Sequence, residues 1–312
     1  MNTLIKVTEV WRPSADGSLL EFGGGLYGDA GNFGRISRQM CFGKGEGLPG
    51  RAWDAGQPIL LKQLQGSWFR RSEAAAAAGL ACAMALPIFV RGQLTAVLVF
   101  LLGELQPHGG AVELWRNDPR VSTDLKLVDG AYGSGEADFE ALTRDTYLSR
   151  GAGLPGLAWQ REGAVFMNDL ATAPGFLRSE SAVAAGLEQG LALPCGAAGH
   201  ENHVLTLLSG LRTPLAGRIE SWLPDADEFT LRRQWGHCEL KGSLPPALMP
   251  LTDDMPGCLV SALRSGVPCV SHRVAEQPEP VSNAARDAGL ASLVALPIVC
   301  DGEIGGVLAL YF

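Results

Sequence analysis

Cysteine and histidine carry the widest chemistry in this chain, so their spacing is considered first. The 312 residues include seven cysteines, and four of them lie in the last third: Cys238, Cys258, Cys269 and Cys300. Converging thiolates could hold an iron–sulfur cluster, and a reactive thiol could do redox chemistry. No Cys-x2-Cys pair is present, and an odd number does not suit a disulfide framework. We expect free thiols in a reducing cytoplasm, mostly packed as small apolar side chains.

A second candidate is the run in which Cys195 is followed by His200 and His203. This spacing could suggest zinc, but a structural zinc site needs four convergent ligands, normally with a Cys-x2-Cys or His-x3-His knuckle. The run also falls where other parts of the chain have a short turn, Arg91-Gly92 and Asp301-Gly302. A solvated turn is therefore predicted here, without a metal.

The glycine-rich run from Gly43 to Gly50 offers backbone N–H groups that could bind phosphate. It lacks the Gly-Lys-Ser/Thr ending of a P-loop and does not lead from a strand into a helix in the dinucleotide-binding manner. Pro49 suits the first turn of a helix, where its missing N–H costs nothing. A turn followed by a helix is predicted.

Composition excludes several classes of function. The 25 basic and 33 acidic residues give a net charge of −8, which argues against non-specific nucleic-acid binding. The apolar stretch Leu94 to Leu102 has about half of the roughly 20 residues that a membrane helix needs. We see no signal peptide at the N-terminus and expect a cytoplasmic protein. With 46% hydrophobic residues, the chain can build an ordinary core.

The elements that position these residues come in three copies. Short motifs recur in the same order at a spacing of about 105 residues. They are Gly-Leu-Pro-Gly at Gly47, Gly153 and, as a weaker copy, Asp254 to Gly257; Ala-Gly-Leu at Ala78, Ala185 and Ala288; and Ala-Leu-Pro at Ala85, Ala192 and Ala295. Because this period is too long for a solenoid, each copy is predicted to be a small domain with its own core. The predicted domains are residues 1–103, 104–211 and 212–312.

The first copy shows the order of elements. Leu4 to Trp11 and Leu19 to Tyr27 alternate as two strands around an Asp-Gly turn, and a short helix is predicted near Phe33 to Met40. A helix at about Gly50 to Ala55, a strand at Ile59 to Leu61 and an alanine-rich helix from Ser72 follow. A closing hairpin joins Ala83–Val90 to Leu94–Leu102. This order predicts an α+β fold with an antiparallel sheet and helices mainly on one face.

These motifs resemble the GAF domain, in particular the GAF domains of bacterial sensor kinases and diguanylate cyclases. The residues concerned are the run Gly45–Trp53, then Gly56–Pro58, Ala78–Leu80, Ala85–Ile88 and a closing Gly-x-Leu-x-x-Val-Leu strand. The resemblance covers the chain as three tandem copies, of which the third is the most divergent. It implies a five- or six-stranded antiparallel sheet with a small-molecule cavity between sheet and helices.

Two features depart from that family. GAF domains usually begin and end with long helices that cover the second sheet face, and the short junctions here leave no room for them. Yet Ala96 to Leu102 is apolar at successive positions, so both faces of that strand require burial. We therefore expect the bare sheet faces to be covered by one another in a compact body, or by a second chain in a homodimer.

The resemblance places the ligand cavity beside the helix–strand–helix segment that follows the Gly-Leu-Pro-Gly motif. The side chains that it implies for ligand binding are aromatic or polar: Trp53, Phe69, Arg70 and Arg71, then Trp159, Asp169, Phe176 and Arg178, and finally His272. Small ligands are usually held in such aromatic-lined clefts with a few fixed polar groups. The tryptophans could equally be core residues, and the arginines could lie in a solvated loop.

The resulting interpretation is a non-enzymatic sensory or regulatory protein that binds a small molecule or a partner protein, with the ligand and any cofactor unidentified. A signalling protein and a second copy are the expected partners, and neither nucleic acid nor membrane is expected. One alternative is a thiol enzyme similar to free methionine-R-sulfoxide reductase. That family has a cysteine where this chain has Pro49, Pro155 and Pro256. A degenerate interaction scaffold is the other alternative.

Overall fold

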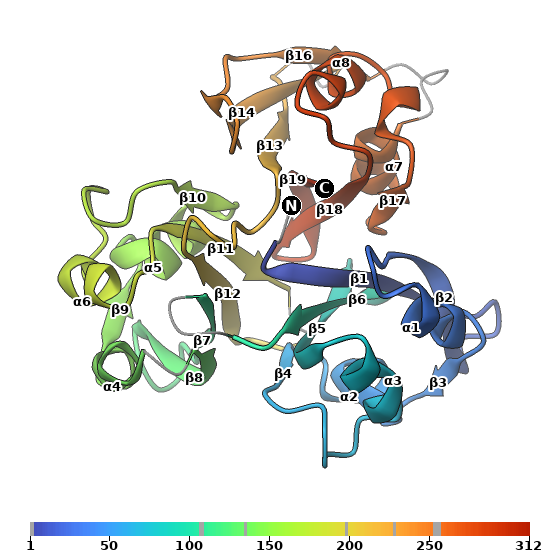
Figure 1. The fold of residues 1–312 in the computed structure, drawn as a ribbon, viewed down its shortest axis with the longest axis horizontal. Coiled ribbons are helices and arrows are strands. Elements are labelled where there is room, and N and C mark those ends of the chain that lie inside the picture. Colours follow the sequence, from blue (N-terminus) through green and yellow to red (C-terminus); the bar gives the residue numbers. More distant parts are fainter. Residues whose placement is uncertain (1–2, 106–108, 134–135, 197–198, 227–228, 252–256) are drawn as a thin grey trace.

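The strands of the protein form three antiparallel sheets. The computed structural model describes residues 3–105, 109–133, 136–196, 199–226, 229–251 and 257–312 (Figure 1). The α+β architecture and the three tandem GAF-like sheets predicted from the repeats are confirmed. Among the described residues, no helix is long and apolar enough to cross a membrane.

The first sheet has the strand order β3-β2-β1-β6-β5-β4. Its domain runs through β1 (Ile5–Pro13), β2 (Leu19–Leu26), α1 (Gly31–Ser37), β3 (Cys41–Gly43), α2 (Gly47–Ala55), β4 (Ile59–Leu61), α3 (Ser72–Ala77), β5 (Leu80–Val90) and β6 (Gln93–Gly103). The sequence did not predict β3, which pairs with β2 at the sheet edge. Helix α2 also begins three residues before the predicted start, at the first glycine of the motif.

The second sheet repeats this topology in the order β10-β11-β12-β7-β8-β9. Its elements are β7 (Gly110–Asn117), β8 (Asp124–Tyr132), α4 (Ala137–Arg144), β9 (Tyr147–Ser149), α5 (Gly153–Arg161), β10 (Val165–Met167), α6 (Ser179–Ala184), β11 (Gln189–Cys195) and β12 (Asn202–Ser209).

The third domain departs from the other two in its first half. Its elements are β13 (Arg218–Pro224), β14 (Thr230–Cys238), β15 (Gly242–Ser243), β16 (Leu248–Pro250), α7 (Cys258–Ser265), β17 (Cys269–Ser271), η1 (Val274–Glu276), α8 (Val281–Arg286), β18 (Leu293–Cys300) and β19 (Glu303–Tyr311). The short strand β15 pairs with β14 where the other domains have a helix, whereas β16 pairs with β14 as β3 pairs with β2. Of the weak third motif, residues 254–256 lie outside the described residues, and α7 begins after Gly257.

The helix at or just after the Gly-Leu-Pro-Gly position of each domain ends with one residue in the left-handed conformation. These residues are Gly56 after α2, Glu162 after α5 and Gly266 after α7, with φ of 63°, 51° and 65°. Two of the three are glycine, which adopts positive φ without the Cβ penalty that Glu162 bears. The three caps provide a common reference for comparing positions between the domains.

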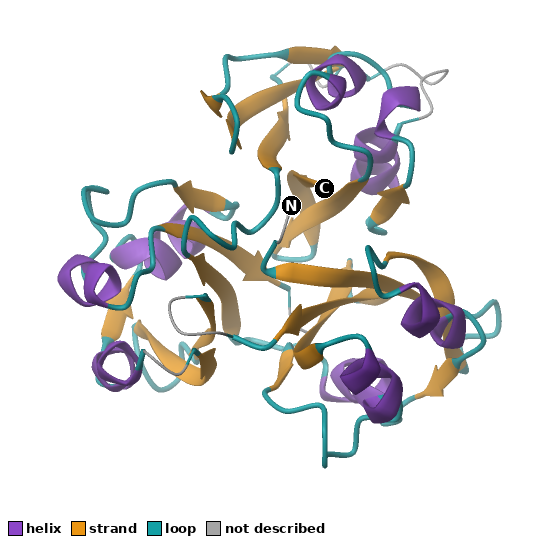
Figure 2. Cartoon of the chain, in the orientation of Figure 1, coloured by secondary structure: helices purple, strands orange, loops and turns teal. Residues whose placement is uncertain are grey.

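The two faces of each sheet bury different cores. In β6, Val97, Val99 and Leu101 face the domain's own helices, whereas Leu98, Phe100 and Leu102 face a core shared by all three domains. The shared core also receives Leu191, Leu193, Leu205 and Leu207 from the second sheet and Val294, Leu296, Ile298, Leu308 and Leu310 from the third. Helices therefore lie at the periphery and strands toward the centre (Figure 2). The sheet faces that lack flanking helices cover one another within one chain.

Three similar contacts close the domains into a ring. The edge strand of each domain, or the residue after it, lies against the second strand of the next domain. Lys62 pairs with Asp129 at 2.6 Å, and Phe166 stacks on Trp235 with ring centroids 5.8 Å apart. A Cβ placed on Gly24 would touch Val270, so β17 approaches β2 in the same manner. The single chain thus reproduces a closed three-fold arrangement of like subunits.

Candidate functional site

Arg71, one of the predicted ligand-binding residues, is buried inside the first domain. Its guanidinium makes a bidentate ion pair with Glu9 of β1, with N–O distances of 2.6 and 2.9 Å. It also donates to the Ser37 hydroxyl at 2.5 Å. The Arg71 side chain is 2% exposed and that of Glu9 is fully buried. Such planar two-point pairing is the strongest form of Arg–carboxylate contact.

The same carboxylate accepts two further hydrogen bonds. The Trp11 indole N–H donates to Glu9 at 3.1 Å, and the Tyr27 hydroxyl donates at 3.2 Å. Burial, with the Glu9 charge adding to it, raises the pKa of Tyr27 and keeps the phenol protonated. Aromatic rings surround the guanidinium: Phe33, Phe69, Trp11 and Phe42, with centroids 4.5 to 5.9 Å from Arg71. Protein groups therefore satisfy the buried charge.

The second domain contains the same arrangement. Arg178 pairs with Glu113 of β7 at 2.5 and 2.9 Å and donates to the Thr143 hydroxyl at 2.5 Å. Trp115 donates to the carboxylate at 3.0 Å, and Tyr132 donates at 3.4 Å. We name these groups, together with the equivalent group around Glu220 in the third domain, the carboxylate clusters.

The third carboxylate cluster is built from other positions. Glu220 of β13 is fully buried and receives Arg233 of β14 at 2.5 Å and Arg218 of its own strand. The Trp222 indole donates to it at 3.0 Å and the Tyr311 hydroxyl at 2.5 Å. Both arginines come from strands, whereas Arg71 and Arg178 each immediately precede a helix.

The sequence contained a signal for these clusters. Each domain has a glutamate two residues before the tryptophan that recurs on its first strand. The pairs are Glu9 and Trp11, Glu113 and Trp115, and Glu220 and Trp222. The recurrence of the tryptophans is visible in the repeat alignment, but the glutamates did not enter the predicted site. A charged residue that alternates with a tryptophan on an otherwise apolar strand faces the same side and needs a buried partner.

The other predicted residues occupy varied environments. Phe69 and Phe176 are buried beside the arginines Arg71 and Arg178. Arg70 instead points to the surface, where it pairs with Glu46 at 2.6 Å. Asp169 is exposed, and its carboxylate accepts from the backbone of Ala171 and the hydroxyl of Thr172. The Thr172 hydroxyl lowers the pKa of Asp169.

Two of the remaining three predicted residues line cavities. Trp53 is partly buried against the core of the first domain. His272 is exposed and lines a cavity of about 360 Å³ between the first and third domains. Trp159 lines a larger cavity, of about 590 Å³, which we name the axial cleft.

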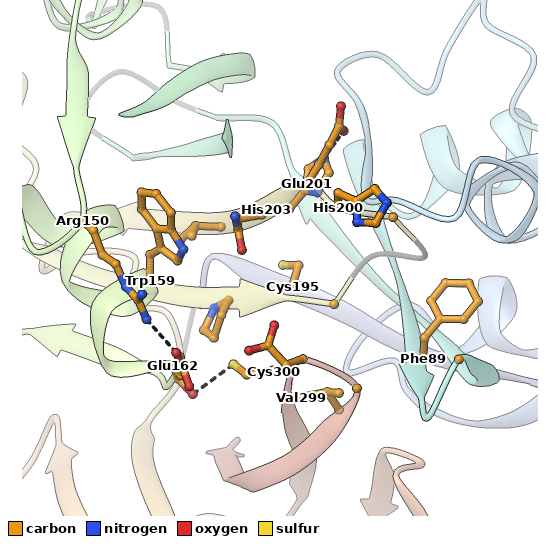
Figure 3. Close-up of a pocket in the computed structure, with 18 residues that line it drawn as sticks. Phe89, Arg150, Trp159, Glu162, Cys195, His200, Glu201, His203, Val299 and Cys300 are labelled. Carbon is orange, nitrogen blue, oxygen red and sulfur yellow. Dashed lines mark hydrogen bonds and ion pairs between the residues drawn. The ribbon is translucent and has the colours of Figure 1, made fainter. Parts of the chain in front are cut away.

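The axial cleft lies where hairpins of the three domains converge (Figure 3). Phe89 and Gly92 come from the first domain, and Val299 to Gly302 from the third. The second domain supplies the larger part: Arg150, Trp159, Glu162, Pro194 to Gly196 and Gly199 to Val204. Its volume is within the usual range for small-molecule sites.

One wall of the axial cleft has paired charges beside an aromatic ring. Arg150 and Glu162 pair at 2.6 Å, and the Arg150 guanidinium lies 5.8 Å from the centroid of Trp159. The Cys300 thiol of the third domain donates to the Glu162 carbonyl at 3.1 Å, which joins the two domains at this wall. Asp301 also lines the axial cleft and is exposed.

Three of the side chains that line the axial cleft, those of Cys195, His203 and Cys300, are neutral at physiological pH. His203 lies in β12 and is 4% exposed, so the solvated turn predicted for it is wrong, although His200 is exposed as predicted. Burial lowers the pKa of His203 to about 4. Its Nδ1 has no hydrogen-bond partner among the described residues. Burial also raises the pKa of Cys195 and of Cys300 to about 12, so neither is a thiolate nucleophile. Across the described ranges, no three His, Cys, Asp or Glu side chains converge as metal ligands.

Comparison with known families identifies the first repeat. A GAF domain model matches residues 8–114. This part of the chain belongs to the GAF domain family. The GAF match begins within β1, continues through β6 and includes most of β7. No curated protein matches the chain.

Among solved structures, about a third of the chain is similar to parts of several bacterial proteins. The A. aeolicus nlh2 GAF domain in an inactive state is 19% identical, with 32% of this chain and 58% of that chain covered and a TM-score of 0.26. Free methionine-R-sulfoxide reductase from Neisseria meningitidis in complex with its substrate is 22% identical, with 32% and 51% covered and a TM-score of 0.25. The chain thus spans just over half the length of each of these two GAF-fold structures.

Proposed function

We propose that this protein is a non-enzymatic sensory or regulatory protein that binds a small polar molecule in the axial cleft. The observation that carries the proposal is the cleft itself, a cavity of about 590 Å³ formed by all three domains. It offers an aromatic wall and a paired arginine and carboxylate, and the imidazole of His203 is among its lining side chains. A neutral imidazole there can exchange a hydrogen bond with a ligand without a charge being buried.

The carboxylate clusters explain why the cleft is preferred to the cavities inside the domains. A ligand beside Arg71 or Arg178 would have to displace a buried glutamate that holds its arginine by two hydrogen bonds. Leaving that glutamate unpaired would cost about 3–5 kcal/mol, which few small ligands can offset. The axial cleft requires no such exchange.

The chemistry of the cleft also supports a binding role. Its two thiols are protonated at neutral pH, and a buried histidine with a pKa of about 4 is a weak general base. A site with these groups is suited to holding a polar ligand between domains. A bound ligand would then alter how the hairpins meet, which is a route to signalling.

Native mass spectrometry of the purified protein tests the proposal, with Trp53→Ala as a matched control for Trp159→Ala. These tryptophans occupy equivalent helix positions, three residues before their caps Gly56 and Glu162, but only Trp159 lines the axial cleft. We expect a small molecule retained by the natural protein and by Trp53→Ala to be lost from Trp159→Ala. Thermal-shift screening of amino acids, dicarboxylates and nucleotides should show the same pattern, with affinity weakened about tenfold or more, or ~1.4 kcal/mol. Loss from Trp53→Ala alone would move the site into the first domain.

The carboxylate clusters favour a second candidate, an interaction scaffold whose domain cavities are filled by its own side chains. A scaffold would retain no small molecule and would show no thermal shift with any compound. Its partner would be a signalling protein or a second copy of the chain. Since the sheet faces cover one another internally, a homodimer would have to use another surface, and it stays a prediction that the same mass spectra can check.

Cellular location and excluded partners are part of the same proposal. Free thiols suit a reducing cytoplasm, and the net charge of −8 opposes contact with nucleic acid or anionic lipid. We therefore propose a cytoplasmic protein that binds neither nucleic acid nor membrane.

A further inference from the structure

Two cysteines of the third domain face each other at less than contact distance. Cys258 is the first residue of α7, and Cys269 is the first residue of β17. Their sulfur atoms lie 2.6 Å apart, and both are free thiols. Cys258 is 5% exposed, whereas Cys269 is half-buried.

The other two domains show what these positions normally hold. Cys258 lies eight residues before the cap Gly266, and Cys269 lies three residues after it. The same counts from Gly56 give Leu48 and Ile59, and from Glu162 they give Leu154 and Val165. The strand register agrees, because Ile59, Val165 and Cys269 pair with the alanines of the recurring Ala-Leu-Pro motif. The third domain therefore has two thiols where the others have an apolar contact between helix and strand.

Neighbouring groups hold this pair in place. The backbone N–H of Cys258 donates to the Gln277 side chain at 2.8 Å, and the Gln277 amide donates to the Ser271 hydroxyl at 3.2 Å. Gln277 thus ties the start of α7 to the end of β17. Little movement is needed to bring the two sulfur atoms to bonding distance.

We propose that Cys258 and Cys269 are a redox modification site that hydroperoxides convert to a reversible disulfide. The Cys269 thiolate attacks a peroxide oxygen, an S–O bond forms, the O–O bond breaks, and the leaving hydroxide takes up a proton to become water. Cys258 then gives up its proton, its sulfur attacks Cys269, and the S–O bond breaks to release a second water. Two thiols and one hydrogen peroxide thus give one disulfide and two waters, and a dithiol reductant reverses the change.

The order of attack follows from the surroundings of the two sulfurs. The hydrogen bond from Cys258 lowers the pKa of Cys269, with the Ser261 hydroxyl contributing, although burial opposes the shift. The same hydrogen bond and burial raise the pKa of Cys258. Cys269 is also the more exposed thiol. It is therefore the attacking residue, and Cys258 the resolving one.

This proposal is independent of the axial cleft, and a thiol count on the full chain tests it. After brief treatment with hydrogen peroxide, the protein is denatured, its remaining thiols are alkylated, and its peptides are mapped by mass spectrometry. We expect seven free thiols to fall to five, with a peptide that links Cys258 to Cys269. Dithiothreitol should restore all seven. Oxidation at Cys41, or added oxygen without a cross-link, would overturn the proposal.

The chain itself suggests the matched control, the double variant Cys258→Leu/Cys269→Ile, which copies the apolar pair of the first domain. This variant should fold and lose no thiols under the same treatment. In Cys258→Ser, dimedone should trap a sulfenic acid on Cys269, whereas Cys269→Ser should give no adduct. An adduct on Cys258 with none on Cys269 would contradict the assigned order of attack.

Discussion

The first two domains and the third pair a buried glutamate with arginine in different ways. All three bury a glutamate two residues before a tryptophan on the first strand of the domain, and all three neutralise it. The first two use one arginine that immediately precedes a helix, whereas the third uses two arginines from strands. In the third domain, the position equivalent to Arg178 is the buried Val281. The glutamate has the same position in all three domains, whereas the arginine that pairs with it does not. The glutamate is therefore the constant part of the cluster.

Removal of an arginine should produce the largest loss of stability. It should also distinguish the clusters that have one arginine from the cluster that has two. Arg71→Met leaves Glu9 buried without its cation, and we expect the free energy of unfolding to fall by about 3–5 kcal/mol. Arg233→Met should cost clearly less, because Arg218 still contacts Glu220. Urea unfolding followed by circular dichroism measures both.

The double variant Glu9→Leu/Arg71→Met is the control for this comparison. An apolar pair of similar volume can be neutral or stabilising where an ion pair was buried. Recovery of most of the lost stability would assign the loss in Arg71→Met to the uncompensated charge. If Arg71→Met and Arg233→Met destabilise equally, the second arginine of the third domain is not a substitute for the first.

The second prediction compares the hairpins at the axial cleft. His203 of β12 is buried, and the residues at its register position in the other domains, Ala96 and Gly306, are also buried but have no polar side chain. Burial lowers the pKa of His203 from 6.5 to about 4. The negative charge of Glu201 opposes this shift, and the positive charge of Arg116 adds to it. Between these values the unfolded chain binds more protons than the folded one. The free energy of unfolding therefore falls as pH drops from 6.5 to 4, by about 3 kcal/mol in total, and is unaffected by this group above pH 6.5.

The variant His203→Gln keeps a polar side chain of similar size at this position and removes the titration. Its unfolding free energy should lack this fall between pH 6.5 and 4, whatever its absolute value. The pKa of His237 is lowered in the same direction in both proteins, so the difference between them isolates His203. The exposed His200→Gln should behave as the natural protein does. Parallel pH profiles for His203→Gln and the natural chain would show that His203 is not buried in its neutral form.

These comparisons also show how far the sequence could lead. The recurring motifs predicted three tandem folds and most of their strands, because alternation and turn residues are local signals. The pairing of Arg71 with Glu9 joins residues 62 positions apart, and no local pattern specifies such a contact. Similarly, His203 looked like a turn residue because the insertion relative to Arg91-Gly92 hides the fact that β12 begins at Asn202.

The covered sheet faces were more accessible to prediction. Successive apolar residues in β6 indicated that both faces are buried, and the structure assigns alternate residues to two different cores. The sequence left open whether the covering surface belonged to the same chain. The answer depends on how three separated sheets fit together, which is a property of their shapes and not of any one strand.

A third, smaller effect concerns the tyrosine of each carboxylate cluster. The Tyr311 hydroxyl donates to Glu220 at 2.5 Å, whereas Tyr132 donates to Glu113 at 3.4 Å. A hydrogen bond to a charged group contributes about 1.5–3 kcal/mol when its geometry is good. We expect Tyr311→Phe to lose that amount in urea unfolding and Tyr132→Phe to lose distinctly less. Equal losses would mean that the third cluster gains no more from its tyrosine than the second does.

The smallest effect should come from the polar contact that closes the ring between the first and second domains. Lys62 and Asp129 are paired at 2.6 Å, but their side chains are 46% and 31% exposed, so water screens most of their attraction. Lys62→Met should therefore lower the unfolding free energy by less than about 1 kcal/mol.

The corresponding contact between the second and third domains is apolar, and Trp235 also donates its indole N–H to the Ala164 carbonyl at 3.2 Å. Trp235→Ala should lower the unfolding free energy by up to about 5 kcal/mol, because it removes a partly buried ring from the shared core. This loss should be clearly larger than that of Lys62→Met. High salt should lower the unfolding free energy of the natural protein by as much as Lys62→Met does, and it should leave the unfolding free energy of that variant unchanged, because the exposed ion pair is the group that salt screens. If salt still lowers the unfolding free energy of the variant, the electrostatic contribution comes from another contact in the ring.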